Sequence, residues 1–236
     1  MIIIPRRKTV ILLLFAFLLG IAGTNIHHKN MSVFSQEPTK RIIIDAGHGF
    51  PDGGAIGISG TIESTLNLKI ALITEKLLKE KGYTVIMTRT DEHSLSKDGE
   101  TIKSRKKADM RKRLDTVQKS GADIFVSIHM NKFSDSRYKG AQVIYSGNYA
   151  QSEKLAARIQ QSLNDLKRNE VKRTTLRAPD GIFLLKNATV PAVIVECGFL
   201  SNFAEEQNLI NSDYQKEIAK AICTGIEKYY KDYKEH

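Results

Sequence analysis

The sequence predicts an α/β fold in which helices cover both faces of an open, twisted and mostly parallel sheet, so that the domain has three layers. Short apolar runs alternate with segments of helical periodicity from residue 41 onward. The run DIFVSIH, residues 123–129, is apolar on both faces, which is typical of a central strand covered by helices. The 236 residues suffice for one well-buried domain with some surplus at the front.

Each expected element follows from its own pattern. Leucine and isoleucine at helical spacing predict a first helix, which Gly82 ends. A capping pattern that begins at Ser212 predicts the start of the last helix. Helices are expected at residues 63–81, 104–119, 152–166 and from 212 onward, and strands at residues 42–45, 83–89, 123–129, 140–146, 181–185 and 191–198.

The first 25 residues read as a targeting segment. Arg6, Arg7 and Lys8 precede an apolar run over residues 10–22, which ends in small residues. This order predicts a secretory signal peptide or a retained membrane anchor over residues 1–25, followed by a polar linker over residues 26–40. The domain at 41–236 is therefore expected to work outside the cytoplasmic membrane, either secreted or held at the membrane by this segment.

The basic charge of the chain does not indicate a nucleic-acid-binding protein. The net charge is +10, of which the first thirty residues contribute four lysines or arginines and no acid. The remaining positive charges are spread along helix-like segments, and the chain has no tryptophan on which a base could stack. Together with export, this excludes nucleic acid as a partner. An anionic cell wall or lipid surface fits the charge, as does an ordinary solvated surface.

A glycine-rich loop carries an exposed imidazole. The stretch RIIIDAGHGFPDGGAIG, residues 41–57, runs from an apolar strand directly into His48. Glycines give the backbone conformational freedom and allow a close approach that other residues prevent. The loop is therefore either a simple turn with an incidental histidine or a site that needs His48 at the end of the strand.

Four polar residues lie at the expected carboxyl ends of the strands or just beyond them: His48, Glu63, His129 and Glu196. Ligands of open α/β sheets bind at this edge. Two imidazoles and one carboxylate, here His48, Glu63 and His129, form the set that holds a catalytic zinc with a fourth position open. Glu196 then remains as a general base that takes a proton from water and passes it to a leaving amine.

Each of these residues also has a simpler interpretation. Glu63 could be an ordinary first-turn acid favoured by the helix dipole, and His129 could bond only backbone groups. Glu196 is harder to explain in this way, because a charge at the end of a buried strand is costly without a compensating partner. Cys197 offers a rival mechanism as a nucleophile, but neighbouring side chains alternate across a strand, so Cys197 and Glu196 should face opposite sides.

The remaining cysteine and histidine residues are not assigned to the site. Cys197 and Cys223 could form a disulfide in an exported protein, although both lie in apolar segments where buried free thiols are common. The other histidines lie in the linker, in a loop or at the terminus and are expected to be exposed: His27, His28, His93 and His236.

Five motifs together resemble a known family. The segments IIIDAGHGFPDGGAIG, ESTLNLKIA, VIMTR, ADIFVSIHMN and PAVIVECGFLSN are similar in order and spacing to the zinc-dependent N-acetylmuramoyl-L-alanine amidases of the amidase-3 type, over residues 41–230. The resemblance implies an open α/β sheet with one Zn²⁺ at the strand ends, held by His48, Glu63 and His129, with Glu196 as the catalytic glutamate. It also implies hydrolysis of the amide between N-acetylmuramic acid and the L-alanine of the peptidoglycan stem.

The resemblance extends to further positions. Asn131 matches a family position near the substrate groove. Asp45 is expected to orient His48 by contacting its ring rather than the metal. Met130 and Cys197 depart from the common family pattern, as does Gln118. Met130 is expected to narrow the surroundings of His129, which would affect the affinity for zinc rather than the chemistry.

Within the family, the sequence looks most like the germination-specific amidases of endospore-forming bacteria, which have one catalytic domain behind an N-terminal apolar segment. This likeness implies action on the spore cortex, on the forespore or cortex side of the membrane, ahead of muramic-δ-lactam formation. The activity of family members is often weak until a protein partner binds them, so an activating partner is also expected. Two alternatives stay open: a zinc-containing wall-binding module without turnover, and a zinc peptidase that cuts within the stem.

Overall fold

The computed structural model describes residues 39–234. The predicted export segment, residues 1–25, and the linker as far as residue 38 lie outside the described residues, as do residues 235–236. Within the described residues, no helix has both the length and the apolar composition needed to cross a bilayer.

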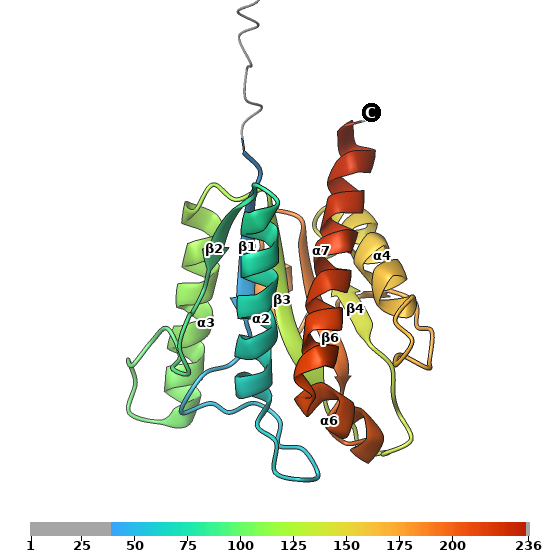
Figure 1. Cartoon of the computed structure of the whole chain (residues 1–236). Coiled ribbons are helices and arrows are strands. Elements are labelled where there is room, and N and C mark those ends of the chain that lie inside the picture. Colours follow the sequence, from blue (N-terminus) through green and yellow to red (C-terminus); the bar gives the residue numbers. More distant parts are fainter. Residues whose placement is uncertain (1–38, 235–236) are drawn as a thin grey trace, which may run out of the picture. The chain divides into compact units, whose positions relative to one another are not determined.

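A six-stranded sheet forms the centre of the domain, in the order β2-β1-β3-β6-β4-β5 (Figure 1). The parallel strands are β1 (Arg41–Ala46), β2 (Thr84–Met87), β3 (Ile124–Asn131) and β6 (Ala192–Phe199). β4 (Gln142–Tyr145) runs antiparallel to β6, and β5 (Leu176–Arg177) runs parallel to β4. The expected mostly parallel sheet is confirmed, and its two longest strands, β3 and β6, are adjacent at its centre.

Helices cover both faces of the sheet. Figure 1 shows α2 (Glu63–Glu80), α7 (Ser212–Lys234) and α4 (Ala150–Asn164) side by side on one face. The other face is covered by α3 (Ile102–Lys119) and α5 (Phe183–Asn187), and α6 (Phe203–Ile210) follows β6. The three-layer arrangement matches the fold class that the sequence predicts.

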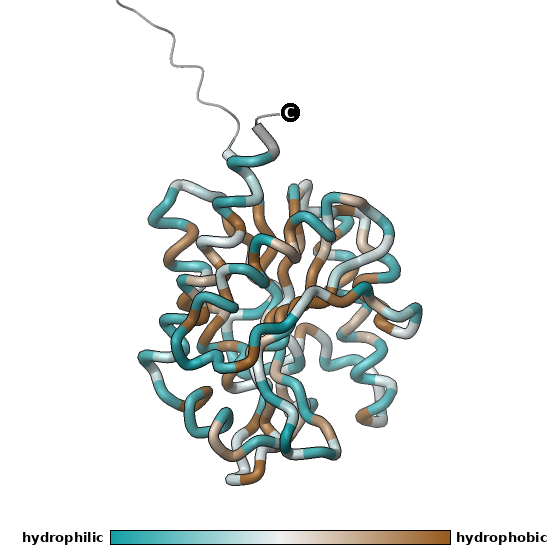
Figure 2. Tube along the Cα trace, turned by 90° about the vertical axis from the view of Figure 1, so that its right-hand side faces the viewer, coloured by the Kyte–Doolittle hydropathy of each residue, from teal (hydrophilic) through white to brown (hydrophobic). Residues whose placement is uncertain are grey.

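The alternation of side chains along the strands divides the core into two parts. Ile42 and Ile44 of β1 belong to the larger cluster, under α2, α4 and α7. Ile43 lies between them and belongs to the smaller cluster, with Phe125 of β3, under α3 and α5. Figure 2 shows these apolar segments running through the interior, while the hydrophilic segments lie mainly in the outer loops and on the outer faces of the helices. Odd- and even-numbered residues of a strand therefore point to opposite faces of the sheet and enter different parts of the core.

One predicted strand is wrong. Residues 181–185, expected as a strand, lead into α5 instead, and the edge strand β5 lies earlier, at Leu176–Arg177. The amide of Lys186 donates to the carbonyl of Ile182 at 2.9 Å, which closes a helical turn. Leu184 and Leu185 are consecutive and both enter the smaller core cluster. A short apolar run fits either a strand or a buried helix, and here its packing decides for the helix.

The helix α6 is absent from the sequence prediction, although the sequence carries a signal for it. The side chain of Asn202 accepts a hydrogen bond from the amide of Glu205 at 3.1 Å, as an N-cap residue does. An Asn three positions before an acid is a capping pattern. It directly follows the residues of β6, so this short helix begins close to the sheet edge that carries the candidate site.

Candidate metal centre

Three of the predicted residues meet at the carboxyl edge of the sheet. His48 lies in the loop after β1, Glu63 is the first residue of α2, and His129 lies near the end of β3. One ligand atom from each lies within 4.8 Å of the others. His48 Nε2 is 3.4 Å and His129 Nδ1 is 2.9 Å from Glu63 Oε1. Two imidazoles and one carboxylate that converge in this way fit a zinc site with an open fourth position.

Glu63 is held by groups on three sides. Its Oε2 accepts a hydrogen bond from the amide of Ala55 at 2.7 Å. Its Oε1 accepts from the amide of Met130 and from the side chain of Asn67, both at 3.2 Å. Because the side chain is only 4% exposed, these donors rather than water fix the position of the carboxylate. The prediction that Glu63 is more than an ordinary first-turn acid agrees with this arrangement.

His48 adopts a backbone conformation that is uncommon for a residue with a side chain. Its φ is 61°, in the left-handed region. Its Nδ1 lies 2.9 Å from Asp52 Oδ2, so the ring is oriented by a carboxylate on one nitrogen while Nε2 points to the cluster. Ring orientation by a carboxylate on the far nitrogen is common for metal-binding histidines. Asp52 is itself held by Lys106 at 2.9 Å and by the amide of Gly54 at 3.2 Å.

Two glycines of the loop are required by the space beside the cluster. A Cβ atom on Gly47 would lie 2.2 Å from Nε2 of His129. A Cβ atom on Gly54, whose φ is 71°, would lie 2.5 Å from Oε2 of Glu63. Both distances are far shorter than any van der Waals contact. The glycine-rich stretch is therefore not an incidental turn, because it lets the chain pass directly against the ligand side chains.

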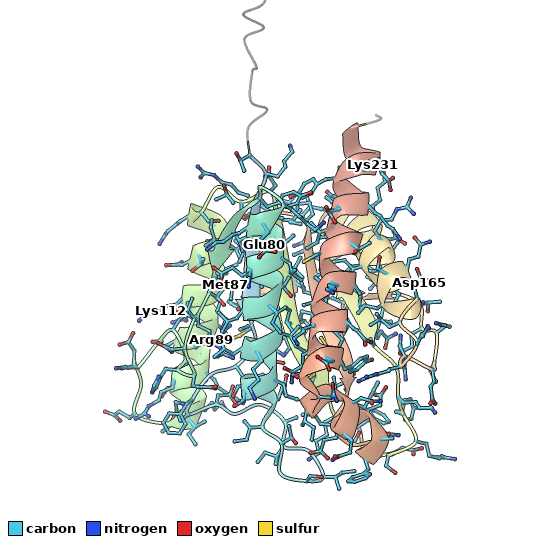
Figure 3. The ribbon with its side chains drawn as sticks, viewed as in Figure 1. Glu80, Met87, Arg89, Lys112, Asp165 and Lys231 are labelled. Carbon is cyan, nitrogen blue, oxygen red and sulfur yellow. The ribbon has the colours of Figure 1, made fainter. Side chains whose placement is uncertain are left out.

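Two buried arginines hold the main chain of the loop. Arg89, labelled in Figure 3, donates to the carbonyls of Ala46, Gly47 and Ser64 at 2.8 to 3.0 Å. Arg113 of α3 donates to the carbonyls of Ala46 and His48. Both guanidinium groups are almost fully buried, at 5% and 1% exposure of the residue. The loop that carries His48 is thus fixed through its carbonyls as well as its side chains.

Asp45 does not reach His48, contrary to the expectation from the sequence. Its carboxylate pairs with Arg113 and accepts hydrogen bonds from Thr88 and Ser127, and it is completely buried. The odd-numbered residues of β1 face α3, where Arg113 lies, so Asp45 acts on His48 only through that arginine. The carboxylate beside His48 is Asp52. Sequence reasoning missed it, although its position four residues after His48 in the same loop is a usable signal.

The electrostatics of the cluster favour a cation. Burial disfavours the charged imidazolium of His48, but hydrogen bonds to Asp52 and Glu63 outweigh this and raise the pKa of His48 to about 9. Burial likewise opposes ionisation of Glu63, yet His129 and His48 hold the pKa of Glu63 well below its usual value. Positive charge is therefore stabilised where the three ligand atoms meet, and a divalent cation supplies such charge.

Glu196 lies on β6 directly beside His129, its partner in the strand register. Its Oε2 is buried and has no hydrogen-bond partner among the described residues. Burial raises the pKa of Glu196 to about 7, although His129 acts in the opposite direction. A buried carboxylate oxygen without a partner, next to a cluster that favours a cation, is the arrangement expected of a proton-transfer group.

The cysteines lie away from this centre. Cys197 is 1% exposed and belongs to the larger core cluster, so it faces the opposite side of the sheet from Glu196. Burial raises the pKa of the Cys197 thiol well above its usual value, which disfavours the reactive thiolate. Cys223 is a buried free thiol on α7. The structure therefore supports neither the nucleophile nor the disulfide that the sequence left open.

The remaining predicted positions are less directly involved. Asn131 is half-buried at the end of β3, where the register with β6 shifts. Met130 is 3% exposed, and its side chain enters the larger core cluster on the opposite face from His129. It therefore does not narrow the surroundings of His129, contrary to expectation. His93 is exposed in its loop, as expected.

The sequence profile of the N-acetylmuramoyl-L-alanine amidase family matches residues 42–228 of the chain. The chain belongs to this family. The germination-specific N-acetylmuramoyl-L-alanine amidase of Bacillus subtilis is 40% identical to this amidase over 194 residues, which are 81% of this chain and 80% of the relative. The family that the sequence motifs resemble is thus confirmed, and its activity implies peptidoglycan as the substrate.

Solved amidase structures share the fold of this amidase. The CwlD amidase from Clostridioides difficile, solved in complex with the GerS lipoprotein, superposes with a TM-score of 0.79 at 38% identity, over 82% of this chain and 100% of that chain. The catalytic domain of CwlV from Bacillus (Paenibacillus) polymyxa var. colistinus superposes with a TM-score of 0.69 at 31% identity, over 82% and 99% of the two chains. The described domain therefore corresponds to a whole amidase catalytic domain.

Proposed function

We propose that this chain is a zinc-dependent amidase that removes peptide stems from spore-cortex peptidoglycan, before muramic-δ-lactam is formed and germination can proceed. The observation that carries the proposal is the convergence of His48, Glu63 and His129 beside the unpartnered carboxylate oxygen of Glu196. The likeness to a germination-specific amidase supports the cortex as the layer that is cut.

The three ligand residues would hold one Zn²⁺ ion. A bound zinc polarises a carbonyl oxygen and lowers the pKa of a water molecule. The residues around the site fit this role, since Asp52 orients His48 and the amides of Ala55 and Met130 fix Glu63. The same donor set also suits iron, so the identity of the metal belongs to the test.

Glu196 supplies the proton transfers. Its carboxylate takes a proton from the attacking water as the water oxygen bonds to the lactyl carbonyl carbon of N-acetylmuramic acid. It then delivers this proton to the α-nitrogen of L-alanine as the carbon–nitrogen bond breaks. The pKa of Glu196, raised by burial to about 7, suits a group that must accept and return a proton near neutral pH. No covalent intermediate with the protein is needed.

The setting of the enzyme is part of the proposal. Residues 1–25 export the chain or anchor it at the membrane, so that the domain acts on the cortex side. A protein partner assists it, as supported by the solved complex of the CwlD amidase with the GerS lipoprotein. Such a partner would promote retention of zinc or placement on the wall.

The Glu196→Gln variant tests the chemistry. We expect the full-length wild-type chain to carry about one zinc ion and to release intact stems with a new L-alanine amino terminus from muropeptides. The variant should keep the zinc, because its ligands are unchanged, and release no stems. Metal analysis and mass spectrometry of the products measure both. Glu80→Gln is the matched control, since Glu80 lies at the opposite end of α2 from Glu63 (Figure 3).

The outcomes separate the alternatives. Fragments cut within the stem would identify a peptidase, and zinc without any turnover would identify a binding module. The cortex role is tested by expressing the same two chains in spores that lack their germination amidase. Only the wild type should restore muramic-δ-lactam to the cortex, and cortex without the lactam in both strains contradicts the assignment.

A further inference from the structure

The basic helix α3 forms one wall of a cavity that opens beside the candidate metal centre. The cavity has a volume of about 310 Å³ and reaches His48 and His129. Arg105, Lys106 and Met110 line it from α3. Lys106 supports the site by holding Asp52, but Arg105 and Met110 have no part in the proposed chemistry, so the position of Arg105 needs a separate explanation.

A second part of the lining, taken here as the floor of the cavity, is apolar. Ile182, Phe183 and Leu184 line it from the start of α5, and Ile194 lines it from β6. Ile194 is two residues before Glu196 and therefore lies on the same face of the sheet. The cavity thus continues from the reacting centre along the face covered by α3 and α5. A group bound there would be attached to one side of the amide that is cut.

Arg105 is a cation on this wall that no carboxylate of the described chain engages. Its Nε donates to the carbonyl of Gly99 at 2.8 Å, which fixes the side chain but leaves its charge unpaired. Lys106, the neighbouring cation, pairs with Asp52 at 2.9 Å. Further along α3, Lys112, which is labelled in Figure 3, pairs with Asp98 at 3.0 Å.

The other charged residues of the lining are paired: Asp45 and Asp109 with Arg113, and Asp52 with Lys106. Arg105 is therefore the cation of the lining that has no carboxylate partner among the described residues, and it lies in a cavity that is otherwise lined in part by apolar side chains.

The two halves of the proposed substrate differ in charge and polarity. The carboxyl group of N-acetylmuramic acid is tied up in the amide, so the sugar side is polar and uncharged near the bond. The stem side begins with alanine, which has a small apolar side chain, and continues with D-glutamate, whose α-carboxyl group is free or amidated. A partly apolar cavity with one unpaired guanidinium is complementary to the stem side.

We propose that this cavity binds the first two residues of the stem and that Arg105 pairs with the α-carboxylate of the second residue. The alanine methyl group then lies on the apolar floor formed by Ile182 and Ile194. Arg105 thereby makes the enzyme selective for stems with a free carboxylate over stems with an amide at this position. The inference rests on the proposed amidase function and adds a specificity determinant to it.

The test uses the zinc-loaded full chain and two substrates, N-acetylmuramoyl-L-alanyl-D-glutamate linked through its γ-carboxyl and the same compound amidated at the α-carboxyl. The wild type should prefer the acid by about tenfold in kcat/KM, the size expected for one charge-assisted hydrogen bond. Arg105→Ala should lose this preference through KM, with kcat changed by less than about twofold. Lys107→Ala, which removes an exposed charge outside the cavity lining, should keep it.

A second measurement decides the matter even without turnover. Calorimetry with the stem dipeptide L-alanyl-γ-D-glutamate and its α-amide should show tighter binding of the acid to Glu196→Gln, and no such difference once Arg105→Ala is added. An unchanged preference in Arg105→Ala, or an equal loss in Lys107→Ala, would overturn the inference. If the wild type hydrolyses neither substrate, the proposed function fails, whereas calorimetry still reports on the cavity.

Discussion

Two carboxylates at the same edge of the sheet are placed in opposite surroundings. Both oxygens of Glu63 accept hydrogen bonds, and the pKa of Glu63 is held well below its usual value. Glu196, on the neighbouring side of His129, has a buried oxygen without a partner among the described residues, and its pKa is raised to about 7. A ligand must stay charged and immobile, whereas a proton carrier must change its charge. The difference in hydrogen bonding supports the proposal that Glu63 binds the metal and that Glu196 transfers the proton.

The largest loss of stability should come from removing Arg113, which holds the loop that carries His48 beside Glu63. Arg113→Met leaves Asp45 and Asp109 buried without their counter-charge and frees the carbonyl of His48. We expect the free energy of unfolding to fall by about 3 to 5 kcal/mol, as for other buried ion pairs that lose one partner. Urea denaturation measures the change.

The matched control lies on the same helix. Arg111→Met removes an exposed arginine and should change the free energy of unfolding by less than about 0.5 kcal/mol. If Arg113→Met lowers the free energy of unfolding by less than about 1 kcal/mol, the buried arginine does not hold the loop. The different surroundings of Glu63 and Glu196 would then need another explanation.

A smaller and more local effect is expected from Gly47→Ala. The added methyl group would lie 2.2 Å from the ring of His129, so the imidazole has to leave its position beside Glu63. We expect zinc affinity to fall by about 100-fold or more, with a loss of stability of about 1 to 3 kcal/mol from overpacking. Competition with a chromophoric chelator gives the affinity.

Gly181→Ala is the control, because a Cβ atom there meets nothing within 4 Å. Its zinc affinity should equal that of the wild type. If Gly47→Ala binds zinc as tightly as Gly181→Ala, His129 is not a ligand. The proposed set of three ligands around Glu63 would then lose one residue.

The positions of the site residues could be predicted from the sequence because they follow from topology. His48 follows β1, and His129 and Glu196 lie in the carboxyl-terminal halves of β3 and β6, so parallel strands bring all three residues to one edge. The alternation of side chains also predicted correctly that Cys197 faces away from Glu196. What was missed is the layer behind the ligands. Asp52 lies four residues after His48 and could have been found from this spacing. The two buried arginines reach the site only in the folded chain, and no spacing along the chain indicates an arginine that binds carbonyl groups.

The errors in the fold have a similar origin. Residues 181–185 were expected as a strand because a short apolar run carries no periodicity of its own, and only the packing of Leu184 and Leu185 against Phe125 and Ile194 makes it helical. Asp45 was assigned to His48 from closeness in sequence. Its side chain points to the face of the sheet where Arg113 lies, and this depends on a helix that is far away along the chain.

The same substitution at the two carboxylates should have opposite effects on stability. In protein kept free of metal by a chelator, Glu63→Gln removes a charged acceptor that several donors and both histidines stabilise, and should lower the free energy of unfolding by about 1 to 3 kcal/mol. Glu196→Gln removes a buried charge without a partner, and should raise it by about 1 kcal/mol at pH 8. Urea denaturation of both variants measures the contrast.

The stabilising effect of Glu196→Gln should depend on pH. Burial raises the pKa of Glu196 to about 7 in the folded protein, above the value of about 4.5 that the unfolded chain has. The folded state therefore binds a proton more tightly, and the wild type loses stability as the pH rises from about 5 to about 8. The advantage of Glu196→Gln should grow over this range and vanish below it. If the gain in the free energy of unfolding stays constant with pH, Glu196 is not held as an unpaired carboxylate. Glu63 and Glu196 would then not differ in their surroundings as described.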